Sequence, residues 1–207
     1  MGNTSATGGP LLPVASPPAP VVLEDVALWT FFQNLFVGIC GNIPGNLFFQ
    51  RWQPEMENLP PVDPQTNWAA LGVTTSDISQ YEFSGHVSAT PSYDEYVAHE
   101  DLDVMVSFYG PLAATNAKIL RDGIQLGQNR EPLFLAGMGL INVGNIVTVP
   151  ELIKQRWLKR VDFDVRIRRA VVRWYAVDDI GEADVTIYTD VPSGTSGAPF
   201  TETVTVT

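Results

Sequence analysis

The chain has few of the residues from which most catalytic and metal sites are built. Its 207 residues contain one cysteine, Cys40, and two histidines, His86 and His99. One cysteine excludes an internal disulfide, and its position at the end of an apolar helical pattern favours a small buried side chain over a reactive thiol. The pair His99–Glu100 opens like a zinc-protease signature, but no second histidine follows at the required spacing, and zinc hydrolysis needs three protein ligands. We therefore expect no metal and no cofactor.

Long apolar runs and basic residues are also scarce. The longest apolar stretch, around Val26–Cys40, contains Gln33 and Asn34, so it is too short and too polar to span a bilayer, and no membrane partner is expected. The chain has 12 Lys and Arg against 23 Asp and Glu, which gives a net charge of −11. This balance argues against a protein that holds nucleic acid by releasing counterions, because such binding requires clustered basic side chains.

The few basic residues are concentrated in one segment. Eight of them form a basic band: Lys154, Arg156, Lys159, Arg160, Arg166, Arg168, Arg169 and Arg173. From Trp174 to the end of the chain every charged residue is acidic. The band could bind nucleic acid or pair with an acidic surface on a neighbouring copy, and the acidic balance of the whole chain favours the second interpretation.

Proline, glycine and hydrophobic periodicity divide the chain into three parts. Residues 1–20 are rich in proline, which removes backbone donors, so this N-terminal arm is expected to be disordered or extended against a partner. Residues 21–190 carry the periodic apolar pattern of a single domain. Residues 191–207 form a C-terminal arm in which Val204 and Val206 alternate with threonines, and we predict that these two valines contact a partner as part of an added strand.

The pattern within the domain predicts an α+β fold, with an antiparallel or mixed sheet packed by two main helices. One helix begins near Glu24 and ends at Gly41, and the other follows Gly110–Pro111. Strands are expected at 47–53, 68–74, 78–87, 95–109, 141–149, 161–167 and 183–188. The clearest is Val161–Ile167, which alternates strictly between apolar and charged residues. Arg169 then falls where an apolar residue is due, which predicts a bulge or bend near 168–169.

The charged side of the strand at 161–167 is the first candidate for a contact between subunits. It carries Asp162, Asp164, Arg166 and Arg168. The two arginines are expected to keep both aspartates ionised, which is unsuitable for the general acid of a glycosidase. We therefore interpret these four residues as a salt-bridged subunit contact.

The second candidate is the sequence QNRE, which consists of Gln128, Asn129, Arg130 and Glu131. It combines an amide pair, a bidentate donor and an acid in an expected loop after a helix. Two interpretations stay open: local capping with an ion pair inside the loop, or a contact with another copy or a neighbouring ring.

Several short motifs recur in a fixed order along the domain. They are RWQPE at Arg51–Glu55, NWAALGVT at Asn67–Thr74, HEDLDVMVSFYGP at His99–Pro111, LRDG at Leu120–Gly123, QNRE at Gln128–Glu131 and W-x-x-R-x-D at Trp157–Asp162. In this order and spacing they resemble the phage neck terminator, or tail terminator, family of tailed bacteriophages. The resemblance covers about Val22–Ile187.

This resemblance implies a structural protein of the virion neck, assembled in the host cytoplasm, and not an enzyme. Terminators of this kind are rings, usually of six copies, that cap the tail tube, stop its growth and join it to the neck and connector proteins. The sheath is a further candidate partner, and DNA passes through the ring without sequence-specific binding. Two other classes stay open: a carboxylate-dependent hydrolase, and a small nucleic-acid-binding module that uses the band at 154–173.

Overall fold

The computed structural model describes residues 10–14, 21–52, 60–61, 63–78, 82–153 and 155–178. This part of the chain contains the helices α1 Asp25–Cys40, α2 Ala113–Gly123 and α3 Gly127–Leu135, and a short 3-10 helix at Gly45–Leu47. Its strands are β1 Phe48–Gln50, β2 Trp68–Ile78, β3 Phe83–Val87, β4 Tyr93–Tyr109, β5 Met138–Val143, β6 Val147–Thr148, β7 Glu151–Ile153, β8 Arg156–Leu158 and β9 Arg160–Ala176. The predicted α+β class is confirmed. The strand expected at 183–188 lies outside the described residues.

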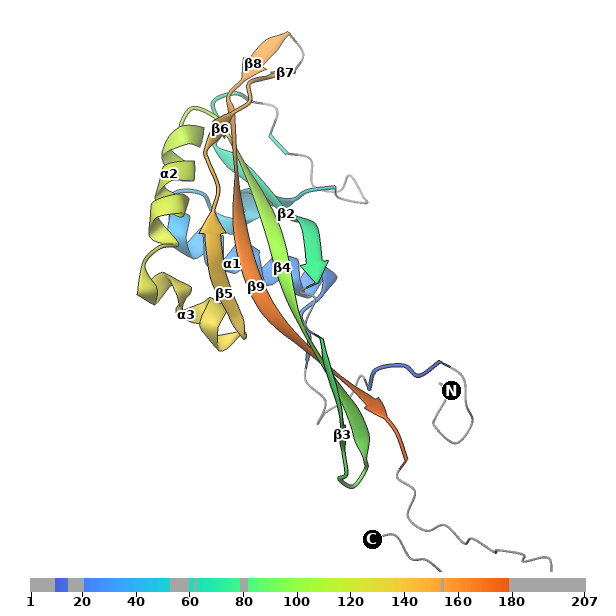
Figure 1. Cartoon of the computed structure of the whole chain (residues 1–207). Helices are drawn as coiled ribbons and strands as arrows, with labels where there is room; N and C mark the ends of the chain where they lie inside the picture. The colour runs from blue at the N-terminus through green and yellow to red at the C-terminus, as the bar shows by residue number, and fades with distance from the viewer. Residues whose placement is uncertain are drawn as a thin grey trace, which may run out of the picture.

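One twisted sheet contains most of the strands. Its order is β1-β2-β4-β9-β5, while β3 pairs with β4 and β6 pairs with β9 beyond that path. β1 runs parallel to β2, and the other neighbouring pairs are antiparallel. β7 and β8 form a separate hairpin that projects from one end of the molecule (Figure 1).

The two longest strands, β4 and β9, run through the whole molecule. Each has 17 residues, and they pair from Tyr93 opposite Ala176 to Tyr109 opposite Arg160 without a shift in register. A strand of this length measures about 56 Å at 3.3 Å per residue. One end of the pair, with β3, projects beyond the helices (Figure 1). We call this part the extension: β3, residues 93–99 of β4 and residues 170–176 of β9.

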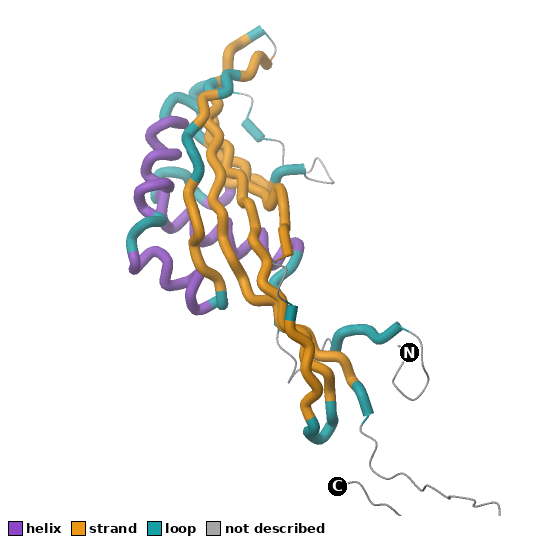
Figure 2. Tube along the Cα trace, viewed as in Figure 1, coloured by secondary structure: helices purple, strands orange, loops and turns teal. Residues whose placement is uncertain are grey.

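All three helices cover one face of the sheet (Figure 2). α1 supplies Phe32 and Phe36 to the core, and α2 and α3 add Leu120 and Leu133. These side chains pack against the apolar sides of β4 and β9, which contribute Leu102, Val104, Val106, Phe108, Val161, Phe163, Val165 and Ile167. The opposite face of the sheet carries no helix among the described residues, and we call it the outer sheet face.

Local sequence signals set the ends of the helices. α1 ends where Gly41 adopts the left-handed conformation with φ 62°, and its amide donates to the Val37 carbonyl. The turn from β4 into α2 depends on Gly110, which has φ 100°. A Cβ there would lie 2.5 Å from the Thr66 carbonyl oxygen, so no other residue fits this turn without moving the neighbouring loop.

The expected strands at 78–87 and 141–149 are each divided between two elements, and two further differences from the sequence-based expectation concern the candidate surfaces. The β4–β9 ladder has no bulge at Arg168–Arg169, so the predicted bend is wrong. Arg169 instead keeps the strand's alternation and points into the helix-covered side, where it is buried. The second difference is α3, which was not expected because Gly127 begins it and Pro132 lies inside it.

Candidate subunit-contact surfaces

The outer sheet face is dominated by charges from three adjacent strands. β2 contributes Asp77, β4 contributes Asp101 and Asp103, and β9 contributes Arg160, Asp162, Asp164, Arg166 and Arg168. They share one face because alternate residues of paired strands point to the same side of a sheet. The four predicted residues of β9 are therefore together, as expected, but they lie among acidic residues that the sequence did not connect with them.

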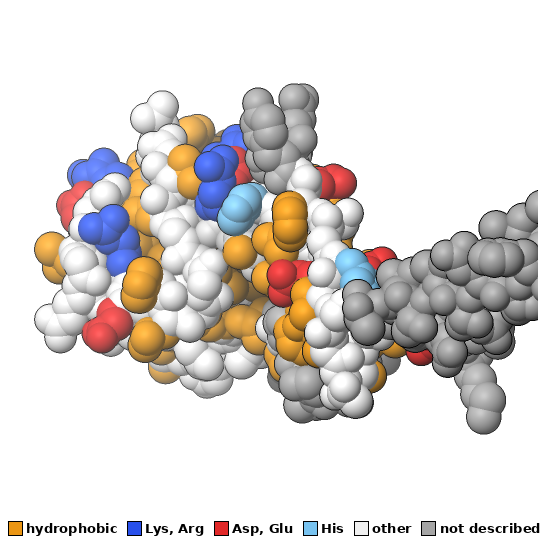
Figure 3. Space-filling view, turned by 60° about the horizontal axis from the view of Figure 1, so that its bottom comes forward, with side chains coloured by type: hydrophobic (Ala, Val, Ile, Leu, Met, Phe, Trp, Pro, Cys, Tyr) orange, Lys and Arg blue, Asp and Glu red, His pale blue; other side chains and the backbone are white. Residues whose placement is uncertain are grey.

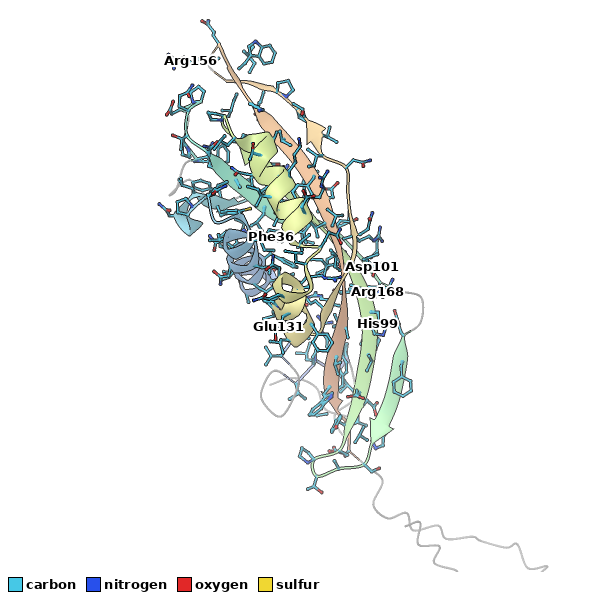
Figure 4. The ribbon with its side chains drawn as sticks, turned by 90° about the vertical axis from the view of Figure 1, so that its left-hand side faces the viewer. Phe36, His99, Asp101, Glu131, Arg156 and Arg168 are labelled. Atoms are coloured by element: carbon cyan, nitrogen blue, oxygen red, sulfur yellow. The ribbon has the colours of Figure 1, made fainter. Side chains whose placement is uncertain are left out.

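Arg166 and Arg168 of β9 pair with aspartates of other strands, whereas Arg160 pairs with Asp162 of its own strand. Arg168 donates two hydrogen bonds to Asp101, from Nε to Oδ1 at 2.7 Å and from Nη2 to Oδ2 at 3.0 Å. Arg166 reaches three aspartates at longer distances: 3.4 Å to Asp77, 3.5 Å to Asp101 and 3.9 Å to Asp103. Figure 4 shows Asp101 and Arg168 side by side on this face. The network is thus internal to one chain: Asp101 and Asp103 lie on the neighbouring strand β4, and Asp77 lies one strand further away, on β2.

The two aspartates of β9 have different surroundings. Asp162 accepts a hydrogen bond from Nε of Arg160 at 2.9 Å. No ion pair joins Asp164 to another described residue, and partial burial together with the charges of Asp103 and Asp162 raises its pKa. The expectation that the arginines of β9 would keep the pKa of Asp164 down is wrong, because they are engaged with the aspartates of β2 and β4. By contrast, the hydrogen bonds from Arg168 lower the pKa of Asp101.

Asp164 gives little support to a carboxylate-dependent hydrolase. A raised pKa is what a general acid requires. However, Asp164 is exposed on an open sheet face and not enclosed in a cleft that would hold a substrate. The surface is better suited to a contact with another protein, since the Asp164 carboxylate forms no ion pair with another described residue and a basic patch could meet it.

Arg169 forms a buried charge cluster on the opposite side of β9. Its guanidinium lies 2.7 Å from Glu100 Oε2 and 3.1 Å from Glu24 Oε2, and it also donates to the Leu23 carbonyl. Arg173 binds the other oxygen of Glu24 at 2.9 Å. The cluster ties the start of α1 to the middle of the sheet. Sequence reasoning missed it because its members lie far apart along the chain.

The QNRE residues are in the first half of α3 and not in a loop, so that expectation is wrong. Asn129 caps locally by donating from Nδ2 to the Gly123 carbonyl at 2.8 Å. Gln128, Arg130 and Glu131 are exposed, and no ion pair within the described residues joins Arg130 to Glu131. These three side chains border a cavity of about 520 Å³ between α3 and β5.

The predicted interface residues therefore occupy two separate surfaces. Glu131 lies on the helix side, away from Asp101 and Arg168 (Figure 4). One subunit can use both the charged residues of β9 and the QNRE residues only if it contacts two neighbouring copies, or one copy and a different protein.

The described members of the basic band do not form a single positive patch. Arg160 and Arg173 are 13 residues apart on β9, which separates them by about 43 Å, and they point to opposite faces. Arg156 lies at the far end of the molecule, in the β7–β8 hairpin (Figure 4). One side of the molecule shows basic, acidic and hydrophobic side chains interspersed (Figure 3). Because most of these arginines already face acids of the same chain, a nucleic-acid-binding module is disfavoured.

The β7–β8 hairpin exposes an apolar pair that the sequence did not single out as a site. Leu152 and Trp157 lie directly opposite each other, and they are 58% and 68% exposed. A projecting tryptophan next to Arg156 has the composition of a protein contact, because Trp and Arg are enriched where binding energy concentrates.

The described part of the N-terminal arm lies along the extension. The Val14 amide donates to the Trp174 carbonyl at 2.7 Å, and Pro13 bridges to Tyr175. Val204 and Val206, predicted to contact a partner, lie outside the described residues.

Neither a metal centre nor a membrane span is found in the described part of the chain. No group of three or more His, Cys, Asp or Glu side chains there is arranged to hold a metal ion. None of the helices there is long and apolar enough to cross a membrane.

A family model described as phage neck terminator protein matches residues 26–191. The chain belongs to this family. A search of curated proteins found no match. Membership in the phage neck terminator family makes the chain a structural component of the tail-neck region of a virion, in contact with other head or tail proteins. The match includes the outer sheet face, α3 and the hairpin, and it excludes the last 16 residues.

Proposed function

We propose that copies of this chain close into a ring, of six subunits, that caps the phage tail tube and ends its polymerisation. The ring joins the tail to the connector proteins of the head, and DNA passes through its lumen. The observation that carries the proposal is the family match over residues 26–191. It makes the protein a structural neck component and not a member of an enzyme class.

The distribution of charge supports a ring. Closed rotational symmetry repeats one contact between two different surfaces of the subunit. The outer sheet face offers an acidic centre at Asp164, and the hairpin end offers Arg156 and Lys159, which have no ion pair with other described residues. Surfaces of opposite sign on one subunit give a heterologous contact a defined orientation.

The acidic balance of the chain suits the passage of DNA. A net charge of −11 per copy gives a ring a strongly negative character. Phosphates gain no counterion release from such a surface, so the genome can slide through without being retained.

The ring is tested by counting copies. Mass photometry and class averages of the protein, free and after incubation with purified tail tubes, should give six copies in a closed ring on the tube end. Tube length should stop increasing once the ring is bound. Two-fold dimers with identical contacts on both sides would contradict the proposal, because they cannot continue around a ring.

The outer sheet face is our proposal for one side of this contact. Arg166→Glu changes the sign of a residue at its centre. Arg121→Glu is the matched control, since the Arg121 side chain is 42% exposed on α2 and, among the described residues, forms its ion pair with the adjacent Asp122. The first variant should lower the yield of rings on tubes, and the control should not. Equal yields for both variants would exclude this face from the contact.

A further inference from the structure

β5 leaves one edge of the sheet open. Among the described residues it pairs only with β9, from Met138 opposite Arg169 to Val143 opposite Val165. An open edge presents unpaired backbone donors and acceptors, to which an extended segment of another chain can add as a further strand.

The register shows which backbone groups of β5 point outward. The Ala170 amide donates to the Gly137 carbonyl at 3.4 Å, which places these two residues at a hydrogen-bonding position of the antiparallel ladder, while the Gly137 amide donates to the Phe134 carbonyl. Such pairs alternate along a ladder, so the backbone groups of Met138 and Leu140 point away from β9. They are available at the edge of the sheet.

The two sides of this edge differ in polarity. On the helix side, the 520 Å³ cavity is lined by Leu133, Phe134, Met138 and Leu140, and Phe134 is 79% exposed. On the other side, a cavity of about 370 Å³ includes His99 and Arg168. A strand added here would therefore need apolar residues on one face and polar residues on the other.

We propose that this edge receives residues 201–207 of a neighbouring copy as an added strand. The segment reads TETVTVT, so Val204 and Val206 share one face, which would lie against Leu133 and Phe134, and threonines occupy the other. Arg130 borders the groove together with Glu131, and it is the positive charge there that Glu202 could meet. This inference rests on the proposed ring, because it requires a second copy within reach.

The position of the end of β9 favours a neighbour over the chain's own edge. Arg169 lies opposite Met138, at the start of β5. Ala176, the last residue of β9, is seven residues further along the strand and therefore about 23 Å from the start of β5. The strand ends pointing away from β5 (Figure 1). The 22 residues between Asp178 and Thr201 can span up to about 73 Å, which is enough to reach an adjacent subunit.

The outer edge of β2 is a less suitable acceptor and serves as the internal comparison. Its residues 74–78 are exposed and include Asp77, which would repel Glu202 and the terminal carboxylate.

The test uses two populations of full-length chains mixed before assembly on tail tubes. One carries Ile141→Cys on β5, which is 45% exposed in the natural protein, and the other carries Thr205→Cys. A short bismaleimide should join the two chains, and Cys40 should stay unreacted because it is buried. Ser76→Cys on the outer edge of β2 replaces Ile141→Cys in the control and should give no crosslinked product.

A second pair of variants tests the backbone of the edge. Leu140→Pro removes an outward amide, and Leu140→Ala removes the same side chain but keeps the amide. Both should shift the melting temperature of the free chain similarly, whereas only the proline variant should abolish the crosslink at residue 141.

The outcomes separate this inference from the proposed function. If six-membered rings form but Thr205→Cys crosslinks to Ser76→Cys, or to neither Ser76→Cys nor Ile141→Cys, the inference is overturned and the proposed ring stands. A crosslink that survives Leu140→Pro would also overturn it, since strand addition needs that amide. If mass photometry shows no ring on the tubes in the same samples, both are overturned.

Discussion

The buried cluster around Arg169 gives the sharpest test of how the core is held together. The Arg169 side chain is 6% exposed, and its partner Glu100 is 12% exposed. In Arg169→Met the Glu100 carboxylate would be left buried without its cation. Breaking a buried pair from one side destabilises a protein by about 3–5 kcal/mol, a large fraction of the 5–15 kcal/mol that holds a typical domain together.

Two further variants separate the cost of a buried unpaired carboxylate from the simple loss of a positive charge. Arg173→Met removes one of the two arginine partners of Glu24, whose side chain is 44% exposed, so we expect a loss of unfolding free energy of about 1 kcal/mol or less. The double variant Arg169→Met with Glu100→Met replaces the whole pair by apolar side chains. It should recover most of the loss, because the burial cost of both charges disappears together.

Urea unfolding of the free chain, followed by tryptophan fluorescence and circular dichroism, measures these differences. For a domain of this size, 3–5 kcal/mol corresponds to a melting temperature lower by about 6–20 °C. If Arg169→Met lowered the free energy of unfolding by no more than Arg173→Met does, the argument from burial would be refuted. A double variant less stable than Arg169→Met would refute it as well.

Three further predictions follow from the outer sheet face and the core. Arg166→Glu should change the unfolding free energy of the free chain by only about 1 kcal/mol, because Arg166 is 40% exposed and its ion pairs are long; a larger loss in urea unfolding would mean that the face is chiefly an internal network. Asp164→Asn should raise the melting temperature at pH 7, because a raised pKa in the folded state means that the ionised Asp164 destabilises the fold. This gain should shrink as the pH falls through the raised pKa towards 3.8, and an equal gain at pH 7 and pH 3 would contradict the prediction. Burial raises the pKa of Cys40 to about 12, so the native protein should not react with a thiol reagent at pH 8, while one thiol should be titrated in urea.

Local patterns in the sequence predicted the elements whose ends are fixed by nearby residues. α1 stops at Gly41 as expected, because a left-handed glycine is the usual helix terminator. The alternation at Val161–Ile167 correctly separated the buried and charged sides of β9. Gly110 lies in the turn that its place before Pro111 suggested. In each case the determining contacts lie within a few residues.

Pairings between distant residues could not be predicted in the same way. The alternation alone predicts a break at Arg169, because its acidic partners Glu24 and Glu100 are 145 and 69 residues away in the sequence. The partners of Arg166 and Arg168 were placed on their own strand, and only the sheet order revealed the aspartates of β2 and β4. Tertiary pairing also decided that QNRE belongs to a helix, against the local signals of Gly127 and Pro132.

The uninterrupted ladder between β4 and β9 raises the question of how so long a ribbon finds one alignment. A slip of two residues would keep every apolar side chain on its own face, because the side-chain period is two. Arg169 lies directly opposite Glu100, and such a slip would move it opposite Ala98 or Leu102. The misaligned ribbon would then bury a guanidinium away from its carboxylate, which is strongly unfavourable. A single charged residue in an apolar row thus selects one register among several, and an aliphatic residue in its place would give the strands freedom to settle in more than one.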